Sequence, residues 1–417
     1  MADGLANRSP TRDIRTICLP CTEEKYGVLV KDAKQFRAWL MESFDLYPEL
    51  FPEGFGKGFH MVDCRTSKKM QLLLRRIELR DGSRYTIRPS FVMPYMTART
   101  SVVEDPLLLR KYGVPFWLLA RLFGRNPMFW FRLECHLGRF SLVGTTVRQA
   151  EIPEHLVADE HHQTCDGDKV YLATTVGGGC CLGVAVAAHA DTDGLTAAYE
   201  VFRDETHNVN PDYQPKTVNT DGWQGTQAAW LALFPLIVVL RCFLHAWLKI
   251  RDRSKNLKEK FAELSRQVWH AYHAPSKRSF SQRLRHLTTW ANRNVSGVVL
   301  EAVRGLCAKK NLWLKHYDHP HGHRTSNMLD RVMRPMHRYF VAGQHLHGDL
   351  ASNERHARGW ALLWNFAPWS PATTKANQGW RSPAERLNQH RYHDSWLHNL
   401  MISASLGGYR IRAPQKP

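Results

Sequence analysis

The sequence predicts an α/β protein with a mixed sheet flanked by helices, interrupted by an all-helical insertion and preceded by a mostly helical N-terminal region. Three observations lead to this fold class. Short apolar runs alternate with helix-like segments over residues 151–245. Residues 246–318 space their apolar side chains as helices do, and residues 319–417 bring further helices to the core. A chain of 417 residues, 43% hydrophobic, is long enough for two or three domains.

The chain is strongly basic. It has 57 Lys and Arg against 38 Asp and Glu, a formal net charge of +19 and a pI near 9.7. Such a balance favours a polyanionic partner, because each phosphate that Lys or Arg neutralises releases counterions. The alternative is a merely solvated basic surface.

The cysteines and the N-terminus predict a cytoplasmic protein. Nine cysteines, an odd number without a regular framework, fit a reducing compartment. The first 13 residues lack the apolar stretch of a signal peptide. The most hydrophobic run, residues 228–240, is interrupted by Pro235 and falls short of the roughly 20 apolar residues that a membrane span needs.

Residues 1–105 form a basic N-terminal region that is a candidate for zinc or DNA-end binding. Thiolates and imidazole suit tetrahedral zinc, and the alternative is ordinary free cysteines. The four candidate zinc ligands are Cys18, Cys21, His60 and Cys64. Ile77 to Arg88 predicts a β-hairpin with a two-residue turn at Asp81-Gly82. Basic residues around it are candidates for phosphate contact or a plain solvated face; they include Lys68, Lys69, Arg75 and Arg76.

Residues 106–150 predict a helix-turn-helix-like segment. Pro115 opens the first helix, Gly124 ends it, and Asn126-Pro127 starts the second. The second helix of such a motif lies in the DNA major groove, with Arg125, Asn126 and Arg132 near its start. The alternative is a plain helical hairpin, because the second helix is rich in aromatic residues.

Residues 151–245 predict three antiparallel strands followed by alternating helices and strands, which is the order of a ribonuclease-H-like sheet. The first strand runs from His155 and ends in Asp159. The other predicted elements are strands over 169–176 and 181–188, a helix over 192–205, a strand over 216–219, a helix over 226–234 and a strand over 236–242. The helical insertion, residues 246–318, then leaves the sheet.

One stretch resembles a known enzyme class. Asp221 stands in Thr-Asp-Gly after a short strand, Phe234-Pro235 follows a helix, and the next strand delivers Cys242-x-x-His245. This pattern resembles the DDE/D-type cut-and-paste DNA transposases with a ribonuclease-H-like core, particularly Mutator-like elements and related bacterial insertion sequences. The resemblance covers residues 150–345 well and the N-terminal third only by general plan.

The resemblance implies a DNA transposase that cleaves at the ends of its element and joins the freed 3′-hydroxyl to target DNA. Its partner is double-stranded DNA, both transposon ends and target. The N-terminal region recognises terminal inverted repeats. The protein acts as a homodimer or higher oligomer, because two ends are paired, and associates with the bacterial nucleoid.

The chemistry needs metal ions held by carboxylates. Two divalent ions about 4 Å apart activate the attacking oxygen and stabilise the leaving one. Mg²⁺, for which Mn²⁺ substitutes, prefers oxygen ligands. The resemblance gives Asp159, Asp221 and Asp330 as the metal ligands, Asp330 following Ser326-Asn327. The resembled families commonly have a glutamate at the third position, so the alternatives for it are Glu301, Asp318 and Glu354.

Cys242 and His245 allow three interpretations: zinc ligands, a nucleophilic dyad or architecture. The resemblance implies that His245 lies near the metal site and assists catalysis, with Cys242 structural. The His-rich segment from His316 to His323 is either a metal site or a loop. Two rival functions remain: a transposase-derived DNA-binding protein without cleavage activity, and a ribonuclease-H-like nuclease that does not join.

Overall fold

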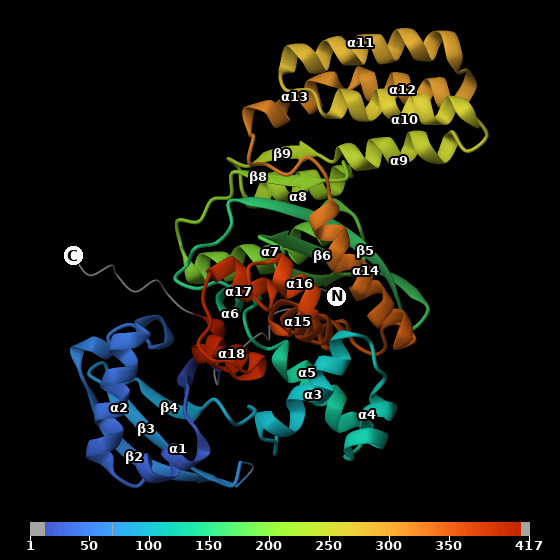
Figure 1. Cartoon of the computed structure of the whole chain (residues 1–417). Coiled ribbons are helices and arrows are strands. Elements are labelled where there is room, and N and C mark those ends of the chain that lie inside the picture. The colour runs from blue at the N-terminus through green and yellow to red at the C-terminus, as the bar shows by residue number, and fades with distance from the viewer. Residues whose placement is uncertain (1–12, 69, 410–417) are drawn as a thin grey trace.

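The computed structural model describes residues 13–68 and 70–409. It is an α/β structure with two mixed sheets, which confirms the α/β part of the predicted fold class (Figure 1). Of the predicted DNA-binding residues, Lys69 lies outside the described residues. No helix within residues 13–68 and 70–409 is long and apolar enough to cross a membrane.

The first sheet belongs to the N-terminal region and has the strand order β1-β4-β3-β2. Its strands are β1 (Thr16–Leu19), β2 (Phe59–Ser67), β3 (Leu72–Leu79) and β4 (Arg84–Pro89), and its helices are α1 (Glu23–Leu29) and α2 (Ala33–Leu46). Three short 3₁₀ turns, Asp13–Arg15, Pro48–Leu50 and Phe55–Lys57, complete it. The predicted mostly helical N-terminal region therefore also contains a four-stranded sheet, of which the sequence predicted only one hairpin. The sheet forms because apolar side chains on β3 and β4 pack against α1 and α2.

The predicted hairpin is present, but its turn is wider than the predicted two residues. Glu78 pairs with Arg84, and the Gly82 amide donates to the Leu79 carbonyl over 3.0 Å. Gly82 has φ +80°, a conformation that favours glycine. The turn is longer than predicted because this hydrogen bond and the Gly82 conformation close the chain before β4 begins at Arg84.

The predicted helical hairpin forms where its capping residues placed it. It consists of α4 (Phe116–Phe123) and α5 (Pro127–Leu137), between α3 (Thr100–Lys111) and the short α6 (Leu142–Thr146). Gly124 follows α4 with φ +71°, and the Asn126 side chain accepts the Met128 amide at 2.7 Å. Pro127 then takes the first helical position, where its missing amide costs nothing. A DNA-binding role for the hairpin stays a prediction.

The second sheet has five strands in the order β7-β6-β5-β8-β9. They are β5 (His155–Cys165), β6 (Asp168–Gly177), β7 (Cys180–Ala187), β8 (Thr217–Thr220) and β9 (Val238–Arg241). The first three are antiparallel, and β8 and β9 run parallel to β5. β5 does not end at Asp159 as predicted, because it continues to pair with β6 as far as Cys165.

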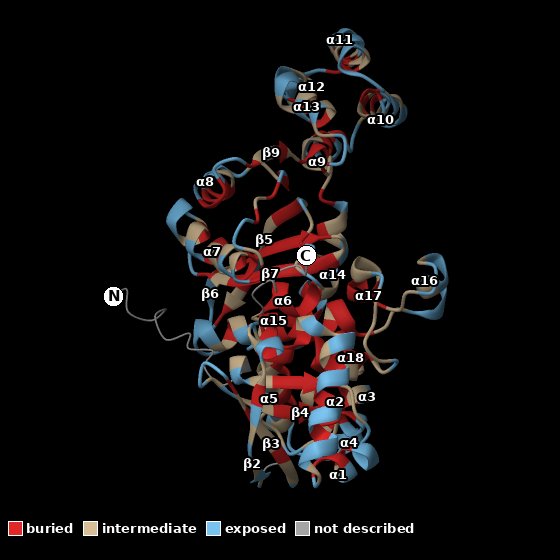
Figure 2. Cartoon of the chain, turned by 90° about the vertical axis from the view of Figure 1, so that its left-hand side faces the viewer, coloured by how far each residue is buried: buried red, intermediate tan, exposed pale blue. Residues whose placement is uncertain are grey.

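Helices cover both faces of this sheet (Figure 1). On one face, α7 (Thr192–Val209) and α8 (Gln224–Leu233) pack on Leu156, Ala158 and Val218. On the other, Val157, Leu172 and Val184 pack with α5, α14 (Asn327–Ala342) and α15 (Leu350–Phe366). Figure 2 shows the strands and α15 as largely buried.

The insertion is all-helical, as predicted, and has its own apolar core. Its helices are α9 (Phe243–Arg253), α10 (Glu259–Tyr272), α11 (Lys277–Asn294), α12 (Gly297–Ala308) and α13 (Lys310–Asp318). It begins directly after β9, a few residues before the predicted boundary. Figure 1 shows it projecting from the end of the sheet that β9 forms.

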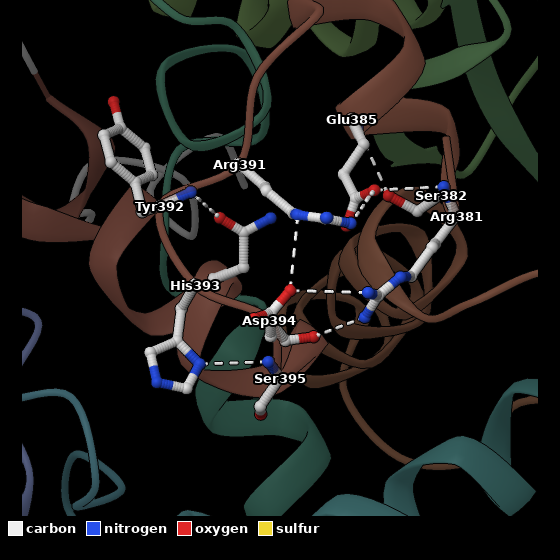
Figure 3. A network of polar contacts seen from close by, with 9 residues as sticks. Arg381, Ser382, Glu385, Arg391, Tyr392, His393, Asp394 and Ser395 are labelled. Atoms are coloured by element: carbon white, nitrogen blue, oxygen red, sulfur yellow. Dashed lines mark hydrogen bonds and ion pairs between the residues drawn. The ribbon is translucent and has the colours of Figure 1, made fainter. Parts of the chain in front are cut away.

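The C-terminal part packs on the core, as predicted, through α16 (Pro371–Ala376), α17 (Pro383–Asn388), α18 (Trp396–Ser403) and a final 3₁₀ turn, Ser405–Gly408. A polar network fixes the connection from α17 to α18 (Figure 3). Arg381 donates to the Asp394 carbonyl oxygen at 2.9 Å, and Arg391 lies 3.5 Å from the Asp394 carboxylate. The Arg381 amide also donates to Glu385 at 3.0 Å.

A buried charged network joins four helices below the second sheet. The Glu134 carboxylate on α5 is fully buried and accepts from Arg110 of α3 at 2.9 Å. Tyr339 of α14 and His356 of α15 also contact it. Burial opposes charge on Glu134, but Arg110 and then His356 outweigh it and lower the pKa to about 2. The network therefore ties the α4–α5 hairpin to α14 through satisfied charges.

Candidate active site

Two of the predicted acids lie at the same level on neighbouring parallel strands. β5 pairs with β8 from His155 to Val157, where Val157 stands opposite Asn219. Two residues further along each chain come Asp159 and Asp221. Because β8 ends at Thr220, the edge of β5 is no longer covered by β8 beside Asp159. The residues where the two strands diverge therefore carry the two carboxyl groups.

The two carboxyl groups share one electrostatic environment. Burial, and then the charges of Asp221 and Glu160, raise the pKa of Asp159 to about 7. Like charges in a partly desolvated position disfavour ionisation. A nearby positive charge would reduce this repulsion.

A rigid turn holds Asp221. Its carboxylate accepts the Trp223 amide at 2.7 Å, and Gly222 between them has φ +99°. A Cβ on Gly222 would lie 2.3 Å from Nε of Arg241, so a larger residue there displaces that arginine. Asp221 and Gly222 thus form a turn that orients the Asp221 carboxylate.

Trp223 was not singled out from the sequence. Its side chain is 54% exposed, and its indole N–H donates to the Ala190 carbonyl at 3.1 Å. An exposed tryptophan held in place by a hydrogen bond thus stands next to Asp221.

Asp330 comes from the first turn of α14 and is connected to the C-x-x-H motif. The Ser326 hydroxyl donates to the Asp330 carboxylate at 3.3 Å. The Ser326 amide donates to Sγ of Cys242 at 3.2 Å. Cys242 is buried directly after β9, next to Thr220 of β8 through a 2.8 Å backbone hydrogen bond. Ser326 therefore couples the third predicted acid to the strands that carry the first two.

Cys242 and His245 form an electrostatic pair. Burial disfavours a Cys242 thiolate, yet hydrogen bonding from His245 outweighs it, so the pKa of Cys242 falls below its usual value. The hydrogen bond to Cys242, with further help from the charges of Asp159 and Asp221, raises the pKa of His245 to about 9. The charges of both acids thus favour the protonated form of His245. A structural role for Cys242 and an assisting role for His245 stay predictions.

The donor set fits a hard divalent cation in part. Asp159 and Asp221 offer carboxylate oxygens, the ligands that Mg²⁺ prefers. Within the described ranges, however, no three His, Cys, Asp or Glu side chains form a group that holds an ion. Mg²⁺ is often bound through one or two carboxylates with waters completing its shell.

The alternative third acids lie elsewhere. Glu301 is exposed on α12, and Asp318 at the end of α13 pairs with Lys277 at 2.5 Å. Glu354 on α15 accepts from the Val186 amide of β7, the edge strand opposite to β8 and β9. Asp330 is thus the candidate with a direct connection to the site.

Glu160 is a further buried acid that the sequence analysis missed. It points to the other face of β5, where Tyr199 donates to it at 2.7 Å and Thr226 at 2.8 Å. Burial raises its pKa, although both hydroxyl groups counteract this. Strand alternation next to Asp159 was the available signal, because adjacent residues of a strand face opposite sides.

The predicted DNA-binding residues divide into two groups. Arg125, Asn126 and Arg132 are exposed around the α4–α5 turn, although the Asn126 side chain is used as a helix cap. Lys68 is exposed. Arg75 and Arg76, in contrast, make contacts within the protein. Arg75 donates to the Val30 carbonyl at 2.8 Å, and Arg76 pairs with Asp63 at 2.5 Å.

The candidate zinc ligands and the His-rich segment have structural contacts. Cys18 is buried on β1, and Sγ of Cys64 lies 3.8 Å from the Val30 carbonyl. His316 is buried on α13 with Nε2 3.0 Å from the Arg241 carbonyl. The His323 carbonyl accepts from Asn219 of β8 at 2.8 Å. The segment thus fastens the end of the insertion to β8 and β9.

Comparisons with known proteins add no family. A scan against protein-family models finds no match, and a search of curated proteins finds none either.

Proposed function

We propose that the protein is a metal-dependent DNA transposase with a ribonuclease-H-like core. The observation that carries the proposal is the juxtaposition of Asp159 and Asp221 where two adjacent parallel strands diverge. Active sites of open α/β sheets form at the carboxyl ends of such strands.

The topology of the second sheet supports the proposed core. Numbered within this sheet, its strands lie in the order 3-2-1-4-5, with three antiparallel strands followed by two parallel ones. Helices α7 and α8 provide the two crossovers on one face. This is the strand order expected for a ribonuclease-H-like sheet, in which the first and fourth strands are neighbours and carry the first two acids.

In the proposed reaction, Asp159 and Asp221, joined by Asp330, would hold Mg²⁺ or Mn²⁺. Such ions would supply activation of a water or a 3′-hydroxyl and stabilisation of the leaving oxygen. The His245 imidazolium beside the acids offers a positive charge for the scissile phosphate. Ser326 orients Asp330 relative to Cys242. Exposed basic residues, among them Arg125 and Arg132, contact double-stranded DNA, and pairing of two ends requires at least a homodimer.

One observation favours a second candidate function, a transposase-derived DNA-binding protein without cleavage. The three acids do not form a group that holds an ion within residues 13–68 and 70–409. A glutamate at position 330 would reach one methylene further than the aspartate present. If Asp330 cannot reach the other acids, DNA binding persists and cleavage is lost.

The test uses purified protein and DNA from both flanks of its gene, with Mg²⁺ or Mn²⁺. Cleavage and joining at defined ends are expected for the wild type and are expected to be lost in Asp221→Ala and Asp330→Ala. Asp212→Ala, an exposed aspartate outside the site, serves as the control and should retain activity. Binding without cleavage selects the second candidate, and cleavage without joined products selects a nuclease. If Asp330→Ala remains active while Asp221→Ala is inactive, a residue other than Asp330 is the third ligand.

A further inference from the structure

The helical insertion carries most of the net positive charge of the chain. Residues 243–318 contain 16 Lys and Arg but only 5 Asp and Glu, a net charge of +11 out of +19. Helices α9 to α13 thus hold more than half of the net charge in under a fifth of the residues. Neither the carboxylates of the site nor the α4–α5 hairpin explains this concentration.

Helix α11 concentrates the charge on one side. It has 18 residues and no Asp or Glu. Phe280, Leu284, Leu287 and Ala291 are buried in the insertion core, against α10, α12 and α13. The opposite face is exposed and carries a row of side chains at successive intervals of three or four residues, which places them on one side of the helix. This row, the α11 stripe, consists of Arg278, Gln282, Arg285, Thr289 and Arg293.

The arginines of the α11 stripe have no acidic partner. Among the described residues, Arg278, Arg285 and Arg293 form no ion pair, whereas Arg266 on α10 pairs with Glu263 at 2.7 Å. Figure 1 places α11 on the outer side of the insertion, away from the sheet. The stripe is therefore an uncompensated positive surface that is accessible from solvent.

We propose that the α11 stripe binds the phosphate backbone of duplex DNA without reading its sequence. From Arg278 to Arg293 the helix extends about 22 Å at 1.5 Å per residue. Duplex DNA carries one charge per about 1.7 Å of its axis, so the three arginines reach phosphates along one face of the duplex. Planar guanidinium groups match phosphate geometry, and Gln282 and Thr289 add neutral donors between them.

The choice of DNA among polyanions rests on the proposed function. The stripe would hold DNA beyond the ends that the N-terminal region recognises, either the interior of the element or the target. Backbone contacts of this kind fix position and add affinity but carry no sequence information.

The experiment measures binding of a fluorescent duplex of arbitrary sequence over about 50 to 200 mM salt, with chelator present so that no cleavage occurs. The stripe variant is Arg278→Gln/Arg285→Gln/Arg293→Gln. If all three arginines contact phosphates, the slope of log affinity against log salt falls in magnitude by about 2 to 3. Circular dichroism and thermal melting check that the variant is folded.

The matched control is Lys31→Gln/Lys34→Gln/Lys375→Gln, which removes the same charge from exposed residues outside the insertion. An equal change of slope in control and stripe variants would show a general effect of net charge and overturn the proposal. Loss of binding to duplex RNA but not to duplex DNA would overturn it as well.

The result is separable from the test of the proposed function. If the wild type never cuts DNA but the salt slope is smaller in the stripe variant than in the wild type, the transposase proposal is refuted and the DNA-binding role of the α11 stripe stands. A protein that cuts DNA with an unchanged slope in the stripe variant refutes the surface alone.

Discussion

Glu134 and Asp159 are two buried carboxyl groups with opposite surroundings. Glu134 accepts from Arg110, Tyr339 and His356, and its pKa falls to about 2. Asp159 has other acids as its charged neighbours, apart from His245, and its pKa rises to about 7. Charges buried for architecture are paired, whereas those at functional sites are often left in conflict. The conflict at Asp159 is the one that the proposed cation would relieve.

The largest stability effect is expected at Glu134. Glu134→Ala leaves the Arg110 charge buried without its partner, so the free energy of unfolding should fall by about 3 to 5 kcal/mol. Urea denaturation measures this change. The control is Glu154→Ala, which breaks an exposed pair with Lys216 and should cost less than about 1 kcal/mol. Similar losses in Glu134→Ala and Glu154→Ala would show that Glu134 contributes no more than an exposed ion pair.

Asp159→Asn should act in the opposite direction. The folded pKa of about 7 lies above the usual 3.8, so wild-type stability falls as pH rises from about 4 to 7. Asparagine has no carboxyl group to ionise, so the variant does not lose stability over this pH range. At pH 8 the variant should be more stable than wild type by about 1 to 3 kcal/mol, and at pH 4 the two should be equal.

Thermal unfolding across this pH range, without divalent ions, provides the measurement, and Asp212→Asn is the exposed control. Addition of Mg²⁺ should stabilise the wild type at pH 8 and not Asp159→Asn. A destabilised Asp159→Asn at pH 8 would mean that the Asp159 carboxylate is satisfied as Glu134 is.

The smallest effect concerns Ser326. Ser326→Ala removes the donor to Asp330 while leaving the backbone amide bonded to Cys242. DNA cleavage should slow about tenfold, since a charge-assisted hydrogen bond contributes about 1.5 kcal/mol or more. Stability should change by less than about 1 kcal/mol, and Ser326→Thr should restore cleavage. Ser296→Ala, at an exposed helix start, is the control. Unchanged cleavage in Ser326→Ala would exclude Ser326 as a positioning residue.

The sequence predicted those parts of the fold that local signals determine. Asn126-Pro127 begins α5 as expected, and apolar spacing defined the insertion. Apart from its β3–β4 hairpin, the N-terminal sheet escaped prediction because its pairing is distant: Thr16 of β1 stands opposite Thr86 of β4. β2 alternates irregularly and gave no strand pattern.

The candidate site shows the same division. The motif around Asp221 carried its own signal, whereas three features depend on tertiary contacts. The bond from Ser326 to Asp330 lies beside Cys242, 84 residues away. Glu160 receives hydrogen bonds from Tyr199 and Thr226, and Arg76 is paired with Asp63. Spacing along the chain does not encode such partners.

Helix α14 is anchored at both ends and weakened between them. Tyr339 fixes its C-terminal half in the Glu134 network, and Ser326 ties its first turn, which carries Asp330, to Cys242. Pro335 lies between these anchors and lacks the amide that would bond to the Arg331 carbonyl, which weakens the helix at that point. A bend of α14 at Pro335 would therefore change the position of Asp330 relative to the Glu134 network.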